Sequence, residues 1–248
     1  MNIAIVFAGG VGKRMNLKSA PKQFLNLCGK PVLIHTLEHF EKSPMIDKII
    51  IVMLKDYIET TWELVKKYHI EKVEFIVPGG ETGQDSIFNG LEQAKKYENS
   101  ENKNIVLIHD GVRPIFEDDL IERVIGSVEK FGSAISCIPS NETTVIIDDN
   151  KNILSTTERA KTFIARAPQA FFLNEIYDWH KRAQREGIHN IVDSCSMMQK
   201  YSNTAPHIET TCFENIKITT PSDFYTIRAL LEAKNDLDIL GVNLNDYM

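Results

Sequence analysis

The chain has 248 residues, of which 43% are hydrophobic and 25% are charged, and its formal net charge is −6. These values are typical of a soluble globular protein with a sizeable core, and the acidic balance argues against broad nucleic-acid binding. Cys28, Cys137, Cys195 and Cys212 form no CxxC pair, so their spacing predicts neither a zinc site nor a redox pair. We find no apolar run near the ~20 residues of a membrane span and no basic leader, and we expect a cytoplasmic protein with reduced thiols.

Strand-like and helix-like segments alternate along residues 1–139. Continuous apolar runs predict buried strands at 3–7, 48–53, 73–77, 104–110 and 133–139. Helical spacing of apolar residues predicts helices at 31–42, about 57–68, 85–97 and 118–131. This β-α-β order predicts a Rossmann-like α/β fold, a mainly parallel sheet with helices on both faces. Because we find neither an internal repeat nor a low-complexity linker, we expect one domain over residues 1–248.

The alternation is interrupted at about residues 140–165. TTVIID, DNKN and ILSTTE there predict an inserted β-hairpin, two strands around a tight turn. An isolated hairpin is marginal in water, so its apolar face needs a partner, and a second copy of the chain is one solution. Beyond it we expect a helix at about 174–186, strands near 207–212 and at 215–219, and a last helix opened by TPSD, 220–223.

The loop FAGGVGKRM, residues 7–15, follows the first predicted strand. It matches neither the Walker A spacing nor the complete dinucleotide fingerprint. Glycines at the carboxyl end of a strand still let backbone N–H groups approach a phosphate chain. Lys13 and Arg14, with Lys22 in the nearby SAPKQFL, would add positive charge. The alternative interpretation is a tight turn with solvated cations.

The segment HDGVRP, 109–114, also follows a predicted buried strand directly. Asp110 is suited to Mg²⁺, which prefers carboxylate oxygens together with substrate phosphates, and Arg113 is suited to a second phosphate. The alternatives are a turn cap for Asp110 and a structural ion pair for Arg113. We expect His109 to pack behind Asp110 without a catalytic role.

Two more segments carry polar residues at predicted strand ends or within a strand. GGETGQDS, 79–86, offers glycine backbone against which a base could lie, or a helix N-terminus with Asp85 or Ser86 near its cap. NIKIT places Lys217 in an otherwise apolar strand. Since a buried lysine without a partner is costly, Lys217 predicts an anionic ligand or a neighbouring carboxylate.

Taken together, these motifs are similar to those of the cytidylyltransferases of sugar-alcohol phosphates. FAGGVGKRM, APKQFL, GGETGQDS, HDGVRP, APQAF, VDS and ENIKITTPSD occur in that family's order, over essentially the whole chain. The resemblance implies transfer of CMP from CTP to a polyol phosphate, with release of pyrophosphate. It extends to the ribitol 5-phosphate branch, which makes CDP-ribitol for teichoic acid or capsule, and to the 2-C-methyl-D-erythritol 4-phosphate branch of isoprenoid synthesis. The AGG loop and the Val112-Arg113-Pro114 form favour ribitol 5-phosphate.

The resemblance also implies a role for each matching residue. The CTP-binding residues would be Ala8, Gly9, Gly10, Gly12, Gly79, Gly80, Ser86 and Asp110. Asp110 would lie near Mg²⁺ or another divalent cation. The catalytic cations, which stabilise the triphosphate and the transition state, would be Arg14, Lys22 and Lys217. The acceptor-binding residues would be Arg113, Thr143 and Arg159, the last two on a hairpin arm that exchanges between the subunits of a homodimer.

Two positions depart from the family pattern. Gly83 stands where relatives usually carry arginine, and Ala167 stands where threonine usually precedes Pro-Gln, so an acceptor-side hydroxyl is absent. These departures are the only support for a rival interpretation, a non-catalytic nucleotide-binding module, which the retained cations and Asp110 oppose. A dehydrogenase is opposed by the missing third glycine of the fingerprint. We expect no nucleic-acid partner and no membrane partner.

Overall fold

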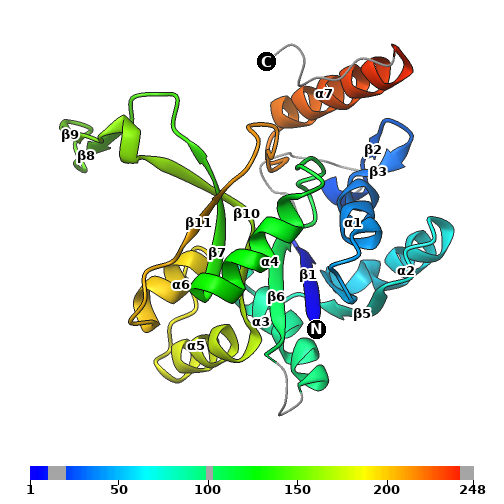
Figure 1. Ribbon diagram of the computed structural model, residues 1–248, viewed down its shortest axis with the longest axis horizontal. Coiled ribbons are helices and arrows are strands. Elements are labelled where there is room, and N and C mark those ends of the chain that lie inside the picture. Colours follow the sequence, from blue (N-terminus) through cyan, green and yellow to red (C-terminus); the bar gives the residue numbers. More distant parts are fainter. Residues whose placement is uncertain (11–20, 99–102, 241–248) are drawn as a thin grey trace.

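A seven-stranded sheet forms the centre of the protein in the computed structural model, which describes residues 1–10, 21–98 and 103–240 (Figure 1). The strands across the sheet, in spatial order, are β11 (Ile208–Thr210), β7 (Ser133–Pro139), β10 (Phe163–Phe172), β6 (Ile105–Asp110), β1 (Asn2–Ala8), β4 (Lys48–Met53) and β5 (Val73–Pro78). Strand β10 runs antiparallel to both of its neighbours, and the other four pairs are parallel. The prediction of a mainly parallel sheet is therefore confirmed.

Helices cover both faces of this sheet, as predicted. The helices that pack on one face are α1 (Val32–Lys42), α2 (Ile58–Lys67) and α4 (Leu120–Phe131). The helices on the other face are α3 (Gly83–Ala94), α5 (Leu173–Arg185) and α6 (Ser194–Tyr201). In β1, Ala4 and Val6 belong to the first core and Ile3 and Ile5 to the second, because successive side chains of a strand point to opposite faces. This double burial explains the continuous apolar runs of the sequence.

The short elements connect these layers. The single-turn helices are η2 (Lys22–Phe24), η3 (Lys55–Tyr57), η4 (Lys95–Tyr97) and η5 (Arg159–Lys161). A small two-stranded sheet precedes α1 and consists of β2 (Asn26–Leu27) and β3 (Lys30–Pro31). The last helix, α7 (Pro221–Leu240), begins where the Asp223 carboxylate accepts hydrogen bonds from the backbone N–H groups of Thr219 and Thr220. In the described ranges, we find no helix with both the length and the apolar character needed to cross a membrane.

The structure corrects one predicted strand and adds one that the sequence pattern concealed. Residues 215–219 are not a strand: Ile216 and Ile218 pack in a small cluster with α7, and the Ile218 N–H donates to the Val112 carbonyl at 2.9 Å. Helix α7 buries their apolar side chains, and these residues form no hydrogen-bonded pairing with a neighbouring strand. Strand β10 was missed because its register shifts between Ala165 and Gln169, which removes the regular alternation expected of a strand.

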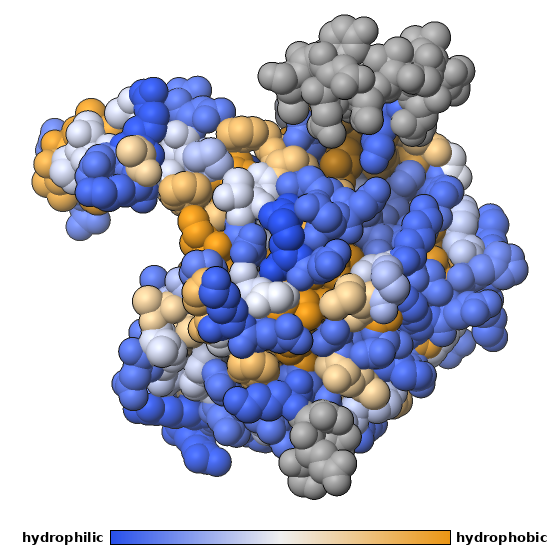
Figure 2. All heavy atoms as spheres, in the orientation of Figure 1, coloured by the Kyte–Doolittle hydropathy of each residue, from blue (hydrophilic) through white to orange (hydrophobic). Residues whose placement is uncertain are grey.

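A two-stranded antiparallel ribbon occupies the predicted insertion at 140–165. Its strands, β8 (Val145–Ile147) and β9 (Ile153–Thr156), project away from the sheet (Figure 1). Apolar side chains lie open on this ribbon, with Ile153 and Leu154 each 65% exposed, and Figure 2 shows the projecting lobe. Its use as a dimerisation arm stays a prediction.

Helix α3 lies unusually close to β1, and a glycine permits the approach. A Cβ atom on Gly90 would lie 2.5 Å from Ile5 Cγ2 and 3.1 Å from Val52 Cγ2. Any larger residue would therefore push the helix away from the sheet. Because α3 begins beside the carboxyl ends of β1 and β5, this contact also sets where its first turn lies.

We expect Gly90→Ala to lower the free energy of unfolding by about 1–3 kcal/mol, the usual cost of overpacking a core. Gly126→Ala in α4 is the matched control, since the structure places no atom within 4 Å of its Cβ position. That control should be neutral or more stable by about 0.4–1 kcal/mol, because alanine favours a helix over glycine. Urea denaturation measures both variants. Equal stability of the two would contradict the close-packing argument.

Candidate active site

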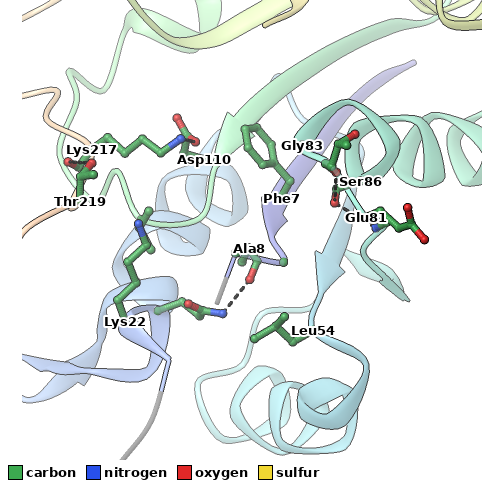
Figure 3. Close-up of a pocket in the computed structure, with 16 residues that line it drawn as sticks. Phe7, Ala8, Lys22, Leu54, Glu81, Gly83, Ser86, Asp110, Lys217 and Thr219 are labelled. Carbon is green, nitrogen blue, oxygen red and sulfur yellow. Dashed lines mark hydrogen bonds and ion pairs between the residues drawn. The ribbon is translucent and has the colours of Figure 1, made fainter. Parts of the chain in front are cut away.

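A cavity of about 550 Å³ lies at the carboxyl ends of the parallel strands (Figure 3). Its wall comes from the ends of β1, β4, β5 and β6 and from three segments outside the sheet: η2, the first turn of α3 and residues 217–219. In open α/β sheets, ligands bind at this edge because the loops of neighbouring strands converge there. The described residues predicted to bind a nucleotide lie along this edge: Ala8, Gly9, Gly10, Gly80, Ser86 and Asp110 line the cavity, and Gly79 lies directly beside Gly80.

The end of β1 is held by a side chain that sequence reasoning missed. Gln23 is 1% exposed, and its Nε2 donates to the Ala8 carbonyl at 2.7 Å. The only sequence signal was its position in the APKQFL motif. Gln23 also lines the cavity, so it shapes the wall at the point where the glycine loop begins. Gly12 and Arg14 lie outside the described residues.

A second glycine segment joins β5 to the first turn of α3. The N-cap is Thr82, and Asp85 lies near the cap as expected, since Thr82 and Asp85 form a reciprocal capping box. Ser86 instead orients the loop, since its hydroxyl accepts from the Gly80 N–H at 3.0 Å and donates to the Thr82 carbonyl at 2.9 Å. A Cβ atom on Gly80 would lie 2.3 Å from Asp85 Cβ, so glycine is required. Thr82 and Gly83, at the N-terminus of α3, line the cavity, so the positive end of the helix dipole faces it.

Three charged side chains meet at the end of β6. Asp110 is 5% exposed, and its Oδ1 lies 2.5 Å from Lys217 Nζ (Figure 3). Its Oδ2 accepts from Arg113 Nε at 2.7 Å. Arg113 Nη1 also donates to the Asn215 carbonyl at 3.0 Å. Lys217 thus has the neighbouring carboxylate that its position predicted. The contacts also connect β6 to the segment 215–217, which is more than 100 residues away in the sequence.

Burial by itself would raise the pKa of Asp110. Arg113 and Lys217 overcome that effect and lower the pKa to about 2, so the carboxylate is ionised at neutral pH. The neighbouring His109 is fully buried, and burial lowers its pKa to about 3. Neutral His109 donates from Nε2 to the Arg113 carbonyl at 3.2 Å. It supports the turn that carries Asp110 and Arg113 and does not reach the cavity.

Lys22 reaches the same cavity from η2 (Figure 3). Its Nζ donates to the Ile218 carbonyl at 2.7 Å. Lys22 therefore binds the backbone of the segment 217–219, and Lys217 belongs to that same segment. Two predicted catalytic cations from distant parts of the sequence are brought to one wall.

A second cavity of about 300 Å³ adjoins the first. Both cavities include Phe7, Gly83, Asp110 and Lys217 in their walls, and the second adds Arg113 and residues of β10. The structure places no atom within 4 Å of the Cβ position of Gly83, so this departure from the family pattern leaves open space where the cavities meet. Ala167, the other departure, lines the second cavity.

Thr143 and Arg159 lie together at the base of the projecting ribbon. Arg159 Nη2 donates to Thr143 Oγ1 at 3.1 Å, and both side chains are exposed. Neither residue lines either cavity. Within the described part of one chain, these two predicted acceptor-binding residues are therefore joined to each other but not to Asp110.

The described ranges contain no group of three or more His, Cys, Asp or Glu side chains arranged to hold a metal ion. A site made from protein ligands alone, such as a structural zinc site, is thus absent from those ranges. Asp110 is the buried, ionised carboxylate that faces both cavities.

Comparisons with known proteins agree with this geometry. The chain is 43% identical to a ribitol-5-phosphate cytidylyltransferase of Vibrio parahaemolyticus, over 97% of this chain and 100% of that protein. It is 38% identical to a 2-C-methyl-D-erythritol 4-phosphate cytidylyltransferase of Clostridium acetobutylicum, over 96% and 100% of the two chains. The crystal structure of 4-diphosphocytidyl-2C-methyl-D-erythritol synthase from Anaerococcus prevotii superposes with a TM-score of 0.80 at 28% identity, covering 93% of this chain and 96% of that one.

A sequence model of one family spans nearly the whole chain. The model described as IspD, 2-C-methyl-D-erythritol 4-phosphate cytidylyltransferase, matches residues 2–233. The sheet, the glycine loops and the charged cluster all fall inside that match. The chain therefore belongs to the IspD family and is a cytidylyltransferase, a kind of nucleotidyltransferase.

Proposed function

We propose that this protein transfers CMP from CTP to ribitol 5-phosphate, forming CDP-ribitol and releasing pyrophosphate. The observation that carries the proposal is the pair of adjoining cavities that share Asp110 and Lys217. Such an arrangement suits two anionic substrates, one in each cavity, that react where the two cavities meet. The choice of ribitol 5-phosphate is supported by the higher identity to the ribitol enzyme, 43% against 38%. We place the enzyme in the cytoplasm, where CDP-ribitol would supply teichoic acid or capsule synthesis.

A second candidate acceptor is 2-C-methyl-D-erythritol 4-phosphate. It is favoured by the family description and by the superposed structure. Both candidates are phosphate monoesters of small polyols, so the same charged wall would receive either. The reaction type is common to both, and only the contacts to the carbon chain differ.

The larger cavity is the proposed CTP site. Backbone N–H groups of Gly9 and Gly10 offer donors to phosphate, and the Gly80 backbone, whose N–H is bonded to Ser86, offers a surface for the base without a side chain in the way. The first turn of α3 adds the positive end of a helix dipole, and Lys22 and Lys217 add full charges. Arg14, outside the described residues, keeps its predicted role beside the triphosphate.

The proposed chemistry needs no protein nucleophile. An oxygen of the acceptor phosphate attacks the α-phosphorus of CTP, a new P–O bond forms, and the bond from the α-phosphorus to the bridging oxygen breaks. Pyrophosphate leaves with that electron pair. Because both reactants are anions, positioning and electrostatic stabilisation by Lys22 and Lys217 would supply most of the rate enhancement. Asp110 holds Lys217 in place.

Magnesium, or another divalent cation, is the proposed cofactor. The ionised Asp110 fits such a cation, because each carboxylate oxygen has a further lone pair beyond its contact with Arg113 or Lys217. One protein carboxylate is enough for Mg²⁺ when nucleotide phosphates and water provide the other oxygens. When bound, the cation would neutralise charge on the phosphates.

We also propose that two copies of the chain pair through the β8–β9 ribbon. Its open apolar side chains, with Ile146 53% exposed, would be buried against the partner. The contact between Thr143 and Arg159 places a cation at the base of that ribbon. In the dimer, Arg159 would complete the acceptor site of the other copy.

An acceptor panel tests the proposed function. With CTP and Mg²⁺, we expect pyrophosphate release with ribitol 5-phosphate at a kcat/KM about tenfold or more above that with 2-C-methyl-D-erythritol 4-phosphate. Ribitol without its phosphate is the control and should give no pyrophosphate, because the nucleophile is a phosphate oxygen. Preference for the methylerythritol phosphate would overturn the acceptor and leave the reaction type standing.

Asp110→Asn tests the charged cluster by acid unfolding. The pKa of Asp110 is about 2 in the folded protein, below its ordinary 3.8, so its contribution to stability is complete above about pH 4 and is lost as the pH falls through about 2. The stability difference between wild type and Asp110→Asn should therefore shrink by about 2 kcal/mol between about pH 5 and pH 2. Turnover of the variant at neutral pH should fall about 10²–10³-fold. A stability difference that stays constant with pH would argue against the ion pairs.

Subunit complementation tests the shared site. Lys217→Ala and Arg159→Ala should each be nearly inactive alone. If Arg159 serves the partner, a mixed dimer has one site that keeps both residues. Random re-pairing makes about half of the dimers mixed, so roughly a quarter of wild-type activity should return. Mixing Lys217→Ala with Asp110→Asn is the control and should restore nothing, because both residues belong to the same chain's site. No recovery after verified exchange would place Arg159 outside the partner's site.

A further inference from the structure

The second cavity contains a cation that the described part of the protein leaves without a partner. Arg166 lines this cavity from β10, beside Arg113 and Lys217. Its Nε atom is excluded from solvent and has no hydrogen-bond partner among the described residues. No ion pair within those residues includes Arg166.

The other charges of the cavity wall are already committed. Asp110 accepts from both Arg113 and Lys217. Asp193 accepts from the Ser196 N–H at 2.9 Å through Oδ1, and from Gln169 Nε2 at 2.9 Å through Oδ2. Both carboxylates are thus held in place by other groups, and neither forms an ion pair with Arg166 among the described residues. Three cations surround the cavity against two carboxylates, so the cavity itself has an excess of positive charge.

Leaving Arg166 in this position has a physical cost. Burial lowers its pKa, and the positive charge of Arg113 lowers it further. A guanidinium without a counter-charge in a partly desolvated wall is unfavourable, and an anion in the cavity would remove that penalty. A planar guanidinium also matches two oxygens of a phosphate at once, which a lysine cannot do.

We infer that Arg166 binds the phosphate group of the acceptor in the second cavity and is an acceptor-binding residue of the reaction. The inference rests on the proposed function for its choice of a polyol phosphate as ligand. Size supports the assignment, since the cavity of about 300 Å³ is the smaller of the two and adjoins the larger one at Asp110 and Lys217. A phosphate held by Arg166 would lie beside the shared wall at which CTP is expected to react.

The test compares Arg166→Met with Arg185→Met. Methionine removes the charge and the donors but keeps much of the side-chain volume, and Arg185 is an exposed arginine of α5 that lines neither cavity. We expect Arg166→Met to raise the KM for the acceptor about 10–100-fold, the scale of a lost charge-assisted hydrogen bond, with the KM for CTP changed less than about twofold. Its thermal midpoint should stay the same or rise, because a partly desolvated charge without a counter-charge is removed. Arg185→Met should match wild type in all three measurements.

A binding measurement without turnover gives a second readout. In the absence of CTP, ribitol 5-phosphate and inorganic phosphate should each raise the thermal midpoint of wild type, and ribitol alone should not. Arg166→Met should lose both shifts. Arg166→Lys, which keeps the charge and serves if the methionine variant does not fold, should retain part of the shift.

Each outcome decides between the claims. An acceptor KM unchanged in Arg166→Met, or a rise confined to the KM for CTP, would overturn the assignment of Arg166. Wild-type preference for the methylerythritol phosphate would overturn only the proposed acceptor, because the Arg166 variants are judged with whichever polyol phosphate wild type uses. If no phosphate stabilises wild type and none is turned over, both claims fail.

Discussion

The ion pairs of Asp110 with Arg113 and Lys217 connect the fold to the site. A buried carboxylate is costly unless opposite charges and hydrogen bonds compensate it. Here the compensation comes from two segments, the loop after β6 and the stretch that leads into α7. The same contacts hold the side chains that the proposed chemistry needs, so the stability of this edge and the arrangement of its charges depend on one another.

Close backbone approaches position the remaining walls. Gly90 lets α3 lie against β1, and Gly80 lets the loop after β5 fold against the first turn of α3. A Cβ atom at either position would meet its neighbours at less than 3 Å. These contacts bring the glycine loops of β1 and β5 and the N-terminus of α3 to one cavity, where the backbone lies close to any phosphate chain or base that binds there. Glycine serves two purposes here, tight packing below the site and an accessible backbone within it.

The two cavities differ in a way that suits two substrates. The larger one combines glycine backbone with lysines, as a nucleotide requires, and the smaller one is surrounded mainly by side-chain charges. Gly83 leaves the space between them open, and Ala167 and Arg166 give the smaller cavity a wall that is short in hydroxyls and rich in charge. Discrimination between polyol phosphates would therefore depend on β10 and on whatever the partner chain adds from its ribbon.

Much of this protein follows from its sequence alone. Continuous apolar runs require strands buried on both faces, so the alternation of runs and amphipathic helices determined the α/β class and nearly every element up to β7. The glycines after β1 and β5 and the acidic residue that ends β6 likewise indicated the edge of the sheet that binds ligands. Only the tertiary structure decided the rest. The contact of Gln23 with Ala8 and the place of Arg166 in the second cavity carry no local pattern, because both depend on how separate segments pack together. Strand β10 contains a register shift that hides its alternation. Residues 215–219 have the apolar pattern of a strand, but α7 and not a neighbouring strand covers their apolar side chains.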